Sequence, residues 1–235
     1  MVGSLAVATG PLGWCLTVGA LVGGDPLLAI ELAGAALVVL WAALVAWDIA
    51  VSHRLAKALS VRAHDTTLVG VQCRVTPALG VDALVVGSVR PRIFVGAQLV
   101  EALSDDELAA VVFHEDHHRR TRAPLRAGGL GAWLRLLGRS ESVRSTVLDR
   151  LTDLETLADA DAIRRGSSPQ SLARALLKGD LSLQPVAFSY AADRRVERLL
   201  DRAAGISIDD QHRLPYECLP VALLTVAALG CHVGL

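Results

Sequence analysis

The sequence predicts a mainly α-helical protein with a small antiparallel β-sheet, an α+β fold to which transmembrane helices are attached. The 235 residues are 52% hydrophobic, yet apolar residues concentrate at the two ends while the middle of the chain is charged. Much of this middle repeats apolar residues with helical spacing, and one region instead shows short β-branched runs. The uneven distribution indicates a membrane protein with a soluble central domain.

Three apolar segments are candidates for membrane-spanning helices, for which roughly 20 residues suffice. Val2–Val22 carries no ionised side chain and lacks the basic start of a signal peptide. Leu27–Ala50 keeps its carboxylates, Glu31 and Asp48, near its two ends, where the membrane tolerates them. Pro215–Leu235 is the third candidate. We therefore expect a helical hairpin at one end and a single helix at the other.

Basic residues set the expected orientation of these helices. The second segment has no Lys or Arg at its N-terminal end. Its C-terminal end is followed directly by the basic side chains of His53, Arg54, Lys57 and Arg62. By the positive-inside rule, the region that follows faces the cytoplasm. The sequence thus predicts two transmembrane helices in residues 1–52, a cytoplasmic domain in residues 53–213 and a C-terminal transmembrane helix in residues 214–235. The expected location is the cell membrane, with lipid as one partner.

Charge and cysteine content exclude some classes of function. The formal net charge is −1 and no RNA- or DNA-binding motif is present, so we expect no nucleic-acid partner. The four cysteines include no Cys-x-x-Cys pair, and all but Cys73 fall in the apolar terminal segments. We interpret them as small buried hydrophobic residues rather than as disulfides or metal ligands.

Short β-branched runs early in the central domain predict strands. Thr66–Thr76 roughly alternates apolar with polar residues, and Ala83–Val89 and Arg92–Val95 follow it. Pro91 between these runs favours an edge strand or a bend, because proline cannot donate to a ladder. An edge within Ala83–Val95 could pair with an extended peptide through main-chain hydrogen bonds. An ordinary small sheet that only covers the next helix is the alternative.

The stretch Ser104–Arg120 has the pattern of an amphipathic helix with a defined start. Ser104 and Glu107 have the spacing of a capping box, which satisfies the first free N–H groups of a helix. Apolar residues then recur with the spacing of one helical face, at Leu108, Val111 and Val112. We expect this face to be buried in the domain.

His114, Glu115 and His118 on this helix form the pattern His-Glu-x-x-His. Histidines four residues apart project from the same face, so both imidazoles can bind one metal ion. Glu115 beside them is placed to act as a general base on water at the metal. His117 points about 100° away from His118 on an ideal helix. The pair His114 and His118 is therefore preferred, and the pair His114 and His117 is the alternative.

Further helices are expected after Pro124. Leu125–Leu137 is weakly amphipathic and either lies at the membrane surface or packs in the core. Ser140–Arg165 is a long helix that carries Glu155 and Asp159 four residues apart, hence on one face. Two more helices complete the domain, Ser168–Lys178 and Asp193–Ala203.

The two carboxylates on this long helix complete a catalytic zinc site. Such a site needs three protein ligands and one open position for water, and Glu155 is the best third ligand. Asp159 would accept a hydrogen bond from the free N–H of a ligand histidine and fix its tautomer. Zn²⁺ is thus the expected cofactor and peptide-bond hydrolysis the expected reaction. A non-catalytic membrane regulator that retains a metal site is the alternative.

The stretch GSVRPRIFVGAQLVEALSDDELAAVVFHEDHHRRTRAPL resembles the core of the BlaR/MecR-type membrane metallopeptidases. Those enzymes typically carry a Pro-Arg-Ile strand, a Leu-Ser-x-x-Glu-Leu helix start and His-Glu-x-x-His followed by basic residues. The element from Glu155 to Asp159 is similar both to these and to the membrane-integral heat-shock and CAAX-prenyl endopeptidases. The resemblance covers roughly Ala83–Arg165. It implies a glutamate-zincin fold with Glu155 as the third zinc ligand.

The resemblance also implies an oxyanion-stabilising residue and a class of substrate. Arg195–Val196 looks like an Arg-hydrophobic element that lies by the active site in the heat-shock type. This makes Arg195 a candidate catalytic residue, with a solvated helix arginine as the alternative. The substrate would be a protein or peptide, including membrane-associated or regulatory proteins.

Overall fold

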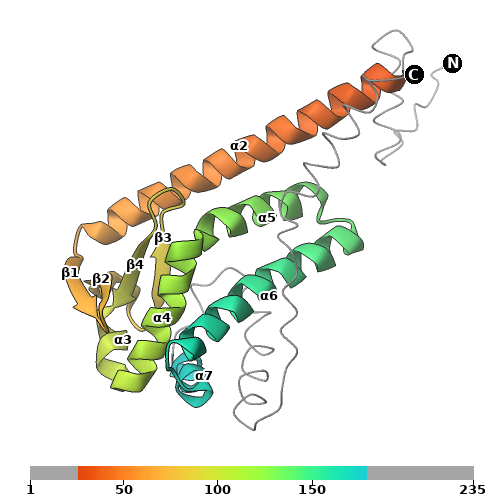
Figure 1. The fold of residues 1–235 in the computed structure, drawn as a ribbon. Helices are drawn as coiled ribbons and strands as arrows, with labels where there is room; N and C mark the ends of the chain where they lie inside the picture. Colours follow the sequence, from red (N-terminus) through yellow and green to blue (C-terminus); the bar gives the residue numbers. More distant parts are fainter. Residues whose placement is uncertain (1–25, 179–235) are drawn as a thin grey trace, which may run out of the picture. The chain divides into compact units, whose positions relative to one another are not determined.

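The computed structural model describes residues 26–178, which are coloured in Figure 1. The predictions for Val2–Val22, Asp193–Ala203 and Pro215–Leu235, and with them the candidate Arg195, lie outside the described residues. Within the described part the protein is mostly helical and has one small sheet of four strands. The broad α+β class predicted from the sequence is therefore confirmed.

Helix α2, Pro26–Ser60, passes from one compact unit of the chain into another. Among the described residues, one unit comprises residues 26–44 and the other comprises residues 45–178. The helix continues past the predicted end at Ala50, because no glycine or proline interrupts the residues that follow. Glu31–Ser60 is long and apolar enough to cross a membrane, a property that signal sequences and core helices share. Among the described residues, no other helix meets this criterion.

The last turns of α2 belong to the second unit and are attached to it by several contacts. Ser52 Oγ accepts a hydrogen bond from the backbone N–H of Gly87 at 3.0 Å. Asp48 forms an ion pair with Arg135, which lies 87 residues away in the sequence. Leu59 is buried in an apolar cluster with residues of the sheet. These contacts make the C-terminal part of α2 a structural element of the second unit.

The strands are β1 (His64–Leu68), β2 (Val71–Thr76), β3 (Ala83–Val86) and β4 (Arg92–Gly96). Their order across the sheet is β1-β2-β4-β3. β2 and β4 are parallel, whereas the other neighbours are antiparallel. The sheet is thus mixed, and the prediction of an antiparallel sheet was wrong for this pair. After β2 the chain reaches the edge as β3 and returns as β4 between them, so β4 must run with β2.

Local geometry also changes two strand predictions. The run Thr66–Thr76 is a hairpin rather than one strand, because Val69 and Gly70 turn the chain with φ angles of 50° and 77°. The predicted edge Ala83–Val95 is divided by a bend at Ser88–Arg90, just before Pro91. Of the two strands in this run, β3 lies at an edge of the sheet, whereas β4 is paired on both sides.

The remaining helices of the described region follow the sheet: α3 (Ala97–Ala102), α4 (Asp105–Thr121), α5 (Ala123–Leu137), α6 (Glu141–Arg164) and α7 (Pro169–Lys178). The predicted capping box of α4 is present. The Glu107 N–H donates to Ser104 Oγ at 3.4 Å, and the Ser104 N–H donates to Glu107 Oε2 at 2.9 Å. Helix α3 had no counterpart in the sequence predictions, whereas α5, α6 and α7 lie where they were expected.

Helix α4 is packed between the sheet and α6, and α7 also contacts it (Figure 1). Ile93 and Val95 of β4 join Val112 of α4 in one buried cluster. Phe94 points to the opposite face of the sheet and packs against Leu59. β4 therefore forms the apolar support on which α4 rests.

Cys73 of β2 lies in the cluster between the sheet and α4, as the interpretation of the cysteines predicted. Burial, together with the negative charge of Asp116, raises the pKa of its thiol to about 11. The thiol therefore stays protonated at neutral pH and behaves as a small apolar side chain. The other three cysteines lie outside the described residues.

Small residues let α4 and α6 approach each other closely. Ala110 of α4 and both Ala158 and Ala162 of α6 are 0% exposed. Ala110 and Ala162 belong to the same buried cluster. Because the distance between packed helices depends on the side chains at their contact, these alanines bring the two backbones close together. The longer side chains of His114 and His118 on α4 can then reach Glu155 on α6.

Gly96, at the end of β4, supports the first testable prediction. A Cβ atom added there would lie 2.0 Å from Gly80 O, and the Gly96 N–H already donates to Asp82 O at 2.7 Å. We expect Gly96→Ala to lower the free energy of unfolding by at least about 1–3 kcal/mol. Urea denaturation of the detergent-solubilised protein measures this change.

Gly131→Ala is the matched control for this substitution. A Cβ at Gly131 would meet only Arg135 Nη2, at an ordinary 3.6 Å, and the residue lies within helix α5. Alanine is the better helix former, so this variant should keep or increase the free energy of unfolding. Equal losses in the two variants would contradict the steric explanation.

Candidate metal centre

Helices α4 and α6 bring three buried side chains together around one point. His114 Nε2 lies 3.0 Å from His118 Nε2, one turn further along α4. Glu155 of α6 lies opposite, with one carboxylate oxygen 3.3 Å from His114 Nε2 and the other 3.2 Å from His118 Nε2. These three side chains form a group that could hold a metal ion. The sequence had predicted the same three ligands.

The spacing of these atoms fits a small tetrahedral ion. Zinc bonds to nitrogen and oxygen are about 2.0–2.2 Å long, so neighbouring ligand atoms of a tetrahedral site lie about 3.3–3.6 Å apart. The observed separations of 3.0–3.3 Å are close to this range. Lone pairs that converge away from water repel one another unless a proton or metal ion lies between them. The residues present therefore fit a metal ion.

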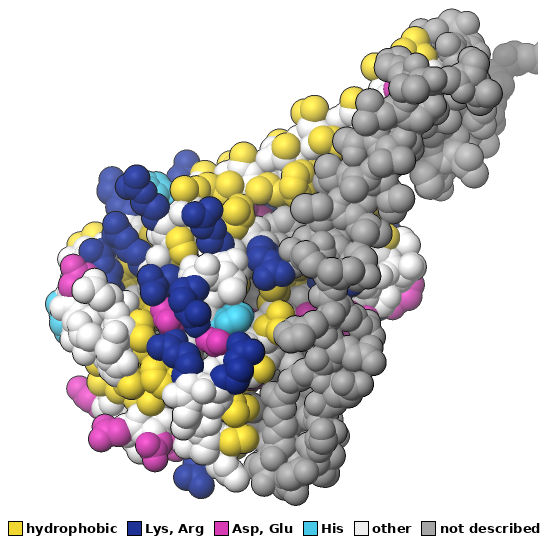
Figure 2. All heavy atoms as spheres, viewed as in Figure 1, with side chains coloured by type: hydrophobic (Ala, Val, Ile, Leu, Met, Phe, Trp, Pro, Cys, Tyr) yellow, Lys and Arg dark blue, Asp and Glu magenta, His cyan; other side chains and the backbone are white. Residues whose placement is uncertain are grey.

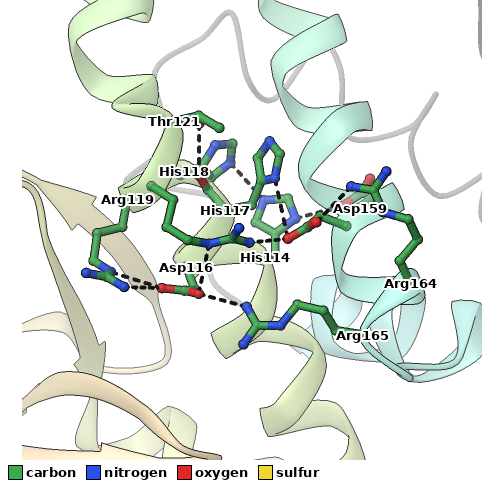
Figure 3. A network of polar contacts seen from close by, with 11 residues as sticks. His114, Asp116, His117, His118, Arg119, Thr121, Asp159, Arg164 and Arg165 are labelled. Atoms are coloured by element: carbon green, nitrogen blue, oxygen red, sulfur yellow. Dashed lines mark hydrogen bonds and ion pairs between the residues drawn. The ribbon is translucent and has the colours of Figure 1, made fainter. Parts of the chain in front are cut away.

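Asp159 contacts His114 at Nδ1, the ring nitrogen that faces away from the candidate metal position. Its Oδ1 lies 2.8 Å from His114 Nδ1, and its side chain is almost fully buried (Figure 3). When Nδ1 carries the proton and donates to Asp159, the lone pair of Nε2 is directed to the metal position. This is the geometry expected from the sequence. Within residues 26–178, Nδ1 of His118 has no hydrogen-bond partner.

Glu115 lies next to His114 on α4 and is half-buried. Burial raises the pKa of its carboxyl group, the two ligand imidazoles oppose this rise, and the charges of Glu155 and Asp82 add to it. A carboxylate with a raised pKa is the better proton acceptor near neutral pH. The geometry is thus compatible with the role of general base.

Asp82 is a residue near the site that the sequence analysis missed. It is buried in the turn before β3, and its Oδ1 accepts a hydrogen bond from the Ala83 N–H at 2.8 Å. Its charge acts on Glu115. A lone acidic residue in the apolar run GVDALVV was the available signal, but its neighbour Glu115 is distant in the sequence.

His117 is not part of the ligand group. Its Nδ1 lies 3.5 Å from Asp161 Oδ2, and the side chain takes part in a separate polar network (Figure 3). Burial lowers the pKa of its imidazole, against the opposing effect of Asp161. The structure thus brings together the preferred histidine pair of the sequence analysis and not the alternative pair with His117.

No protein family, curated protein or solved structure matches this chain. Among residues 26–178, the group that could hold a metal contains three ligands from two helices. Three protein ligands leave one position for water, as in catalytic zinc sites, whereas structural sites use four.

Glu155→Ala tests the ligand set. The variant should lose the metal, because two imidazoles without the carboxylate form an incomplete site. Zinc content per chain, measured by mass spectrometry of the elements after dialysis, reports the outcome. Asp153→Ala is the control, since Asp153 lies on the same helix but pairs with Arg150 of α6 and is half exposed. Stoichiometric zinc in Glu155→Ala would remove Glu155 from the site.

Proposed function

We propose that this chain is a membrane-anchored zinc metalloendopeptidase that hydrolyses peptide bonds of protein substrates. The convergence of His114, His118 and Glu155, with Glu115 beside them on the same helix, is the observation that supports it. Two imidazoles and one carboxylate are a ligand set of catalytic zinc. The resemblance of the sequence to the BlaR/MecR-type glutamate-zincins supports the same reaction.

Each residue of the site has a separate task in this reaction. Bound zinc would supply acidity, lowering the pKa of a water molecule to about 7 and polarising the substrate carbonyl. Glu115 would take a proton from the attacking water and pass it to the leaving amine. Asp159 would keep His114 in the tautomer that presents Nε2. Arg195 is a candidate for oxyanion stabilisation from the sequence alone.

The N-terminal half of α2 supports the membrane anchor. Residues 26–44 lie outside the second unit and extend for roughly 28 Å at ~1.5 Å per residue, close to the ~30 Å of a bilayer core. Further along the chain, C-terminal to this segment, lie the exposed basic side chains of Arg54, Lys57 and Arg62. By the positive-inside rule the catalytic domain is cytoplasmic. Its substrates would then be proteins at or near the inner membrane surface.

Glu115→Gln separates catalysis from metal binding. Glutamine cannot accept the proton, so turnover should fall by about 10²–10⁴-fold while zinc stays bound. Zinc content and the cleavage of fluorescein-labelled casein by the detergent-solubilised protein measure the two effects. Glu141→Gln, at an exposed position of α6, is the control. A Glu115→Gln protein that cleaves casein at the normal rate would exclude Glu115 as the base.

Strand β3 is the segment on which we place the substrate. It forms an edge of the sheet and packs against α4, the helix that carries both histidines. Its main-chain groups on the open side can bond an extended peptide without regard to side-chain sequence. The alignment of a substrate carbonyl in this way supplies a large part of catalysis. The sequence analysis proposed a peptide-binding edge within Ala83–Val95. We now limit the proposed binding segment to β3, Ala83–Val86.

Proline substitutions in β3 test this alignment. In an antiparallel pair, successive N–H groups point alternately toward the partner strand and away from it. Leu84→Pro and Val85→Pro therefore form a matched pair. One of them removes an N–H group that donates to β4, and the other removes an N–H group that points to the open edge. The edge variant should fold and bind zinc but turn over casein roughly tenfold more slowly, since a substrate hydrogen bond is lost. Normal cleavage by that variant would place the substrate elsewhere.

A further inference from the structure

Two buried aspartates outside the ligand group connect α4 with α6. Asp116 stands between the two ligand histidines in the sequence and is 5% exposed, and Asp161 stands two residues after Asp159 and is 8% exposed. Burial by itself would raise the pKa of each carboxyl group, but arginine side chains around them hold both pKa values below the ordinary range. Both are therefore ionised at neutral pH.

Asp116 is bound from three directions. Arg119, on the next turn of α4, donates to its Oδ1 through Nε at 2.9 Å and Nη2 at 2.6 Å. Arg120 donates through Nε to Oδ2 at 3.1 Å. Arg165, which follows the last residue of α6, donates to the same Oδ2 at 2.8 Å. Of these three contacts, the one with Arg165 joins the two helices directly (Figure 3).

Asp161 makes the reciprocal connection from α6 to α4. It accepts a hydrogen bond from Arg164 of its own helix at 2.8 Å. Its other oxygen accepts from Arg120 Nη2 and lies 3.5 Å from His117 Nδ1. The guanidinium of Arg120 consequently bridges both aspartates, using Nε for Asp116 and Nη2 for Asp161. A planar guanidinium can do this because its donors have a fixed spacing.

The turn that ends α6 keeps Arg165 in place. Gly166 has a φ of 104°, the Ser167 N–H donates to Ala162 O at 3.1 Å, and the Gly166 N–H donates to Ile163 O at 3.0 Å. This is the Schellman pattern of a helix C-terminus. Arg165 also lies over the ring of Phe113, with Cζ 4.0 Å from the ring centroid. It thus contacts α4 on both sides of His114, at Phe113 and at Asp116.

We propose that Asp116, Asp161 and the bridging Arg120 are positioning residues of the metal centre. They fix α4 relative to α6 within two helical turns of every ligand, so Glu155 meets the two histidines at a set distance. Metal sites require metal–ligand distances to within about 0.2 Å. A shift of α4 relative to α6 that is much shorter than the length of a hydrogen bond would already exceed this tolerance. The inference rests on the proposed metal centre and assigns a role to Asp116, a position within the His-Glu-x-x-His motif that lies outside the ligand group.

The test compares neighbouring arginines of α4 in the full-length, detergent-solubilised protein. Arg120→Lys replaces the bridge between the helices by one ammonium group, whereas Arg119→Lys changes a contact within α4 only. Asp161→Asn and Asp153→Asn form a second pair, since Asp153 pairs within α6. Zinc affinity is measured by competition with a chelator. The visible spectrum of the Co²⁺-loaded protein reports the coordination geometry.

We expect Arg120→Lys and Asp161→Asn to bind zinc at least roughly tenfold more weakly and to change the Co²⁺ spectrum, the usual effect of losing support behind metal ligands. Arg119→Lys and Asp153→Asn should match the wild-type protein in both measurements. If the bridge variants lose only thermal stability and keep the wild-type zinc affinity and Co²⁺ spectrum, the network is merely structural and the inference fails. If the wild-type protein binds neither metal, the proposed metal centre itself fails, and the inference with it.

Discussion

The close packing of α4 against α6 brings the polar side chains of the candidate site together inside the protein. At this point two imidazoles and the carboxylates of Glu155 and Asp159 are buried within hydrogen-bond distance of one another. Such groups are costly to remove from water unless a cation or protons neutralise them. Because a metal ion would bind only to the folded arrangement, metal binding and folding stability should be coupled at this crossing.

The sheet serves this crossing as a support. β4 is its central strand on the side of α4, and the buried side chains of Ile93 and Val95 hold the helix by its apolar face. The same arrangement leaves β3, within residues 26–178, paired on one side only and beside α4, the helix that carries His114 and His118. A mixed sheet with a returning central strand thus provides both an apolar support for α4 and an edge strand, β3, that contacts the same helix.

Charge is distributed in two layers around α4. In the layer around His114 and His118, the two imidazoles lie against the carboxylates of Glu155 and Asp159, a group that could hold a metal ion. On another side of the same helix, arginines surround Asp116 and Asp161, and Figure 2 shows Lys and Arg side chains gathered over this region of the surface. The carboxylates of Asp116 and Asp161 pair with arginines and stabilise the contact between the helices, whereas the carboxylate of Glu155 lies beside the two imidazoles. The two layers therefore have different tasks although they share one helix.

Features that depend on the local spacing of residues could be predicted before the fold was known. The capping box at Ser104 fixes where α4 begins, and the four-residue spacing of His114 and His118 puts both on one face, because helical geometry relates residues that are close in the chain. The extents of α5, α6 and α7 followed from the same periodicity. Glu155 could be named as a ligand candidate because few carboxylates lie on an apolar helical face.

Contacts between residues that are distant in the chain could not be predicted in this way. Nothing local shows that β4 returns between β2 and β3, that the end of α2 packs on the sheet, or that Arg165 reaches Asp116 over 49 residues. These contacts are set by the packing of whole elements, whose energy is spread over many small apolar contacts. A charged residue at a helix end gives the same local signal whether it faces solvent or bridges to a neighbour. For that reason the pair of histidines on α4 could be predicted from the sequence, whereas the positioning residues Asp116, Arg120 and Asp161 could not.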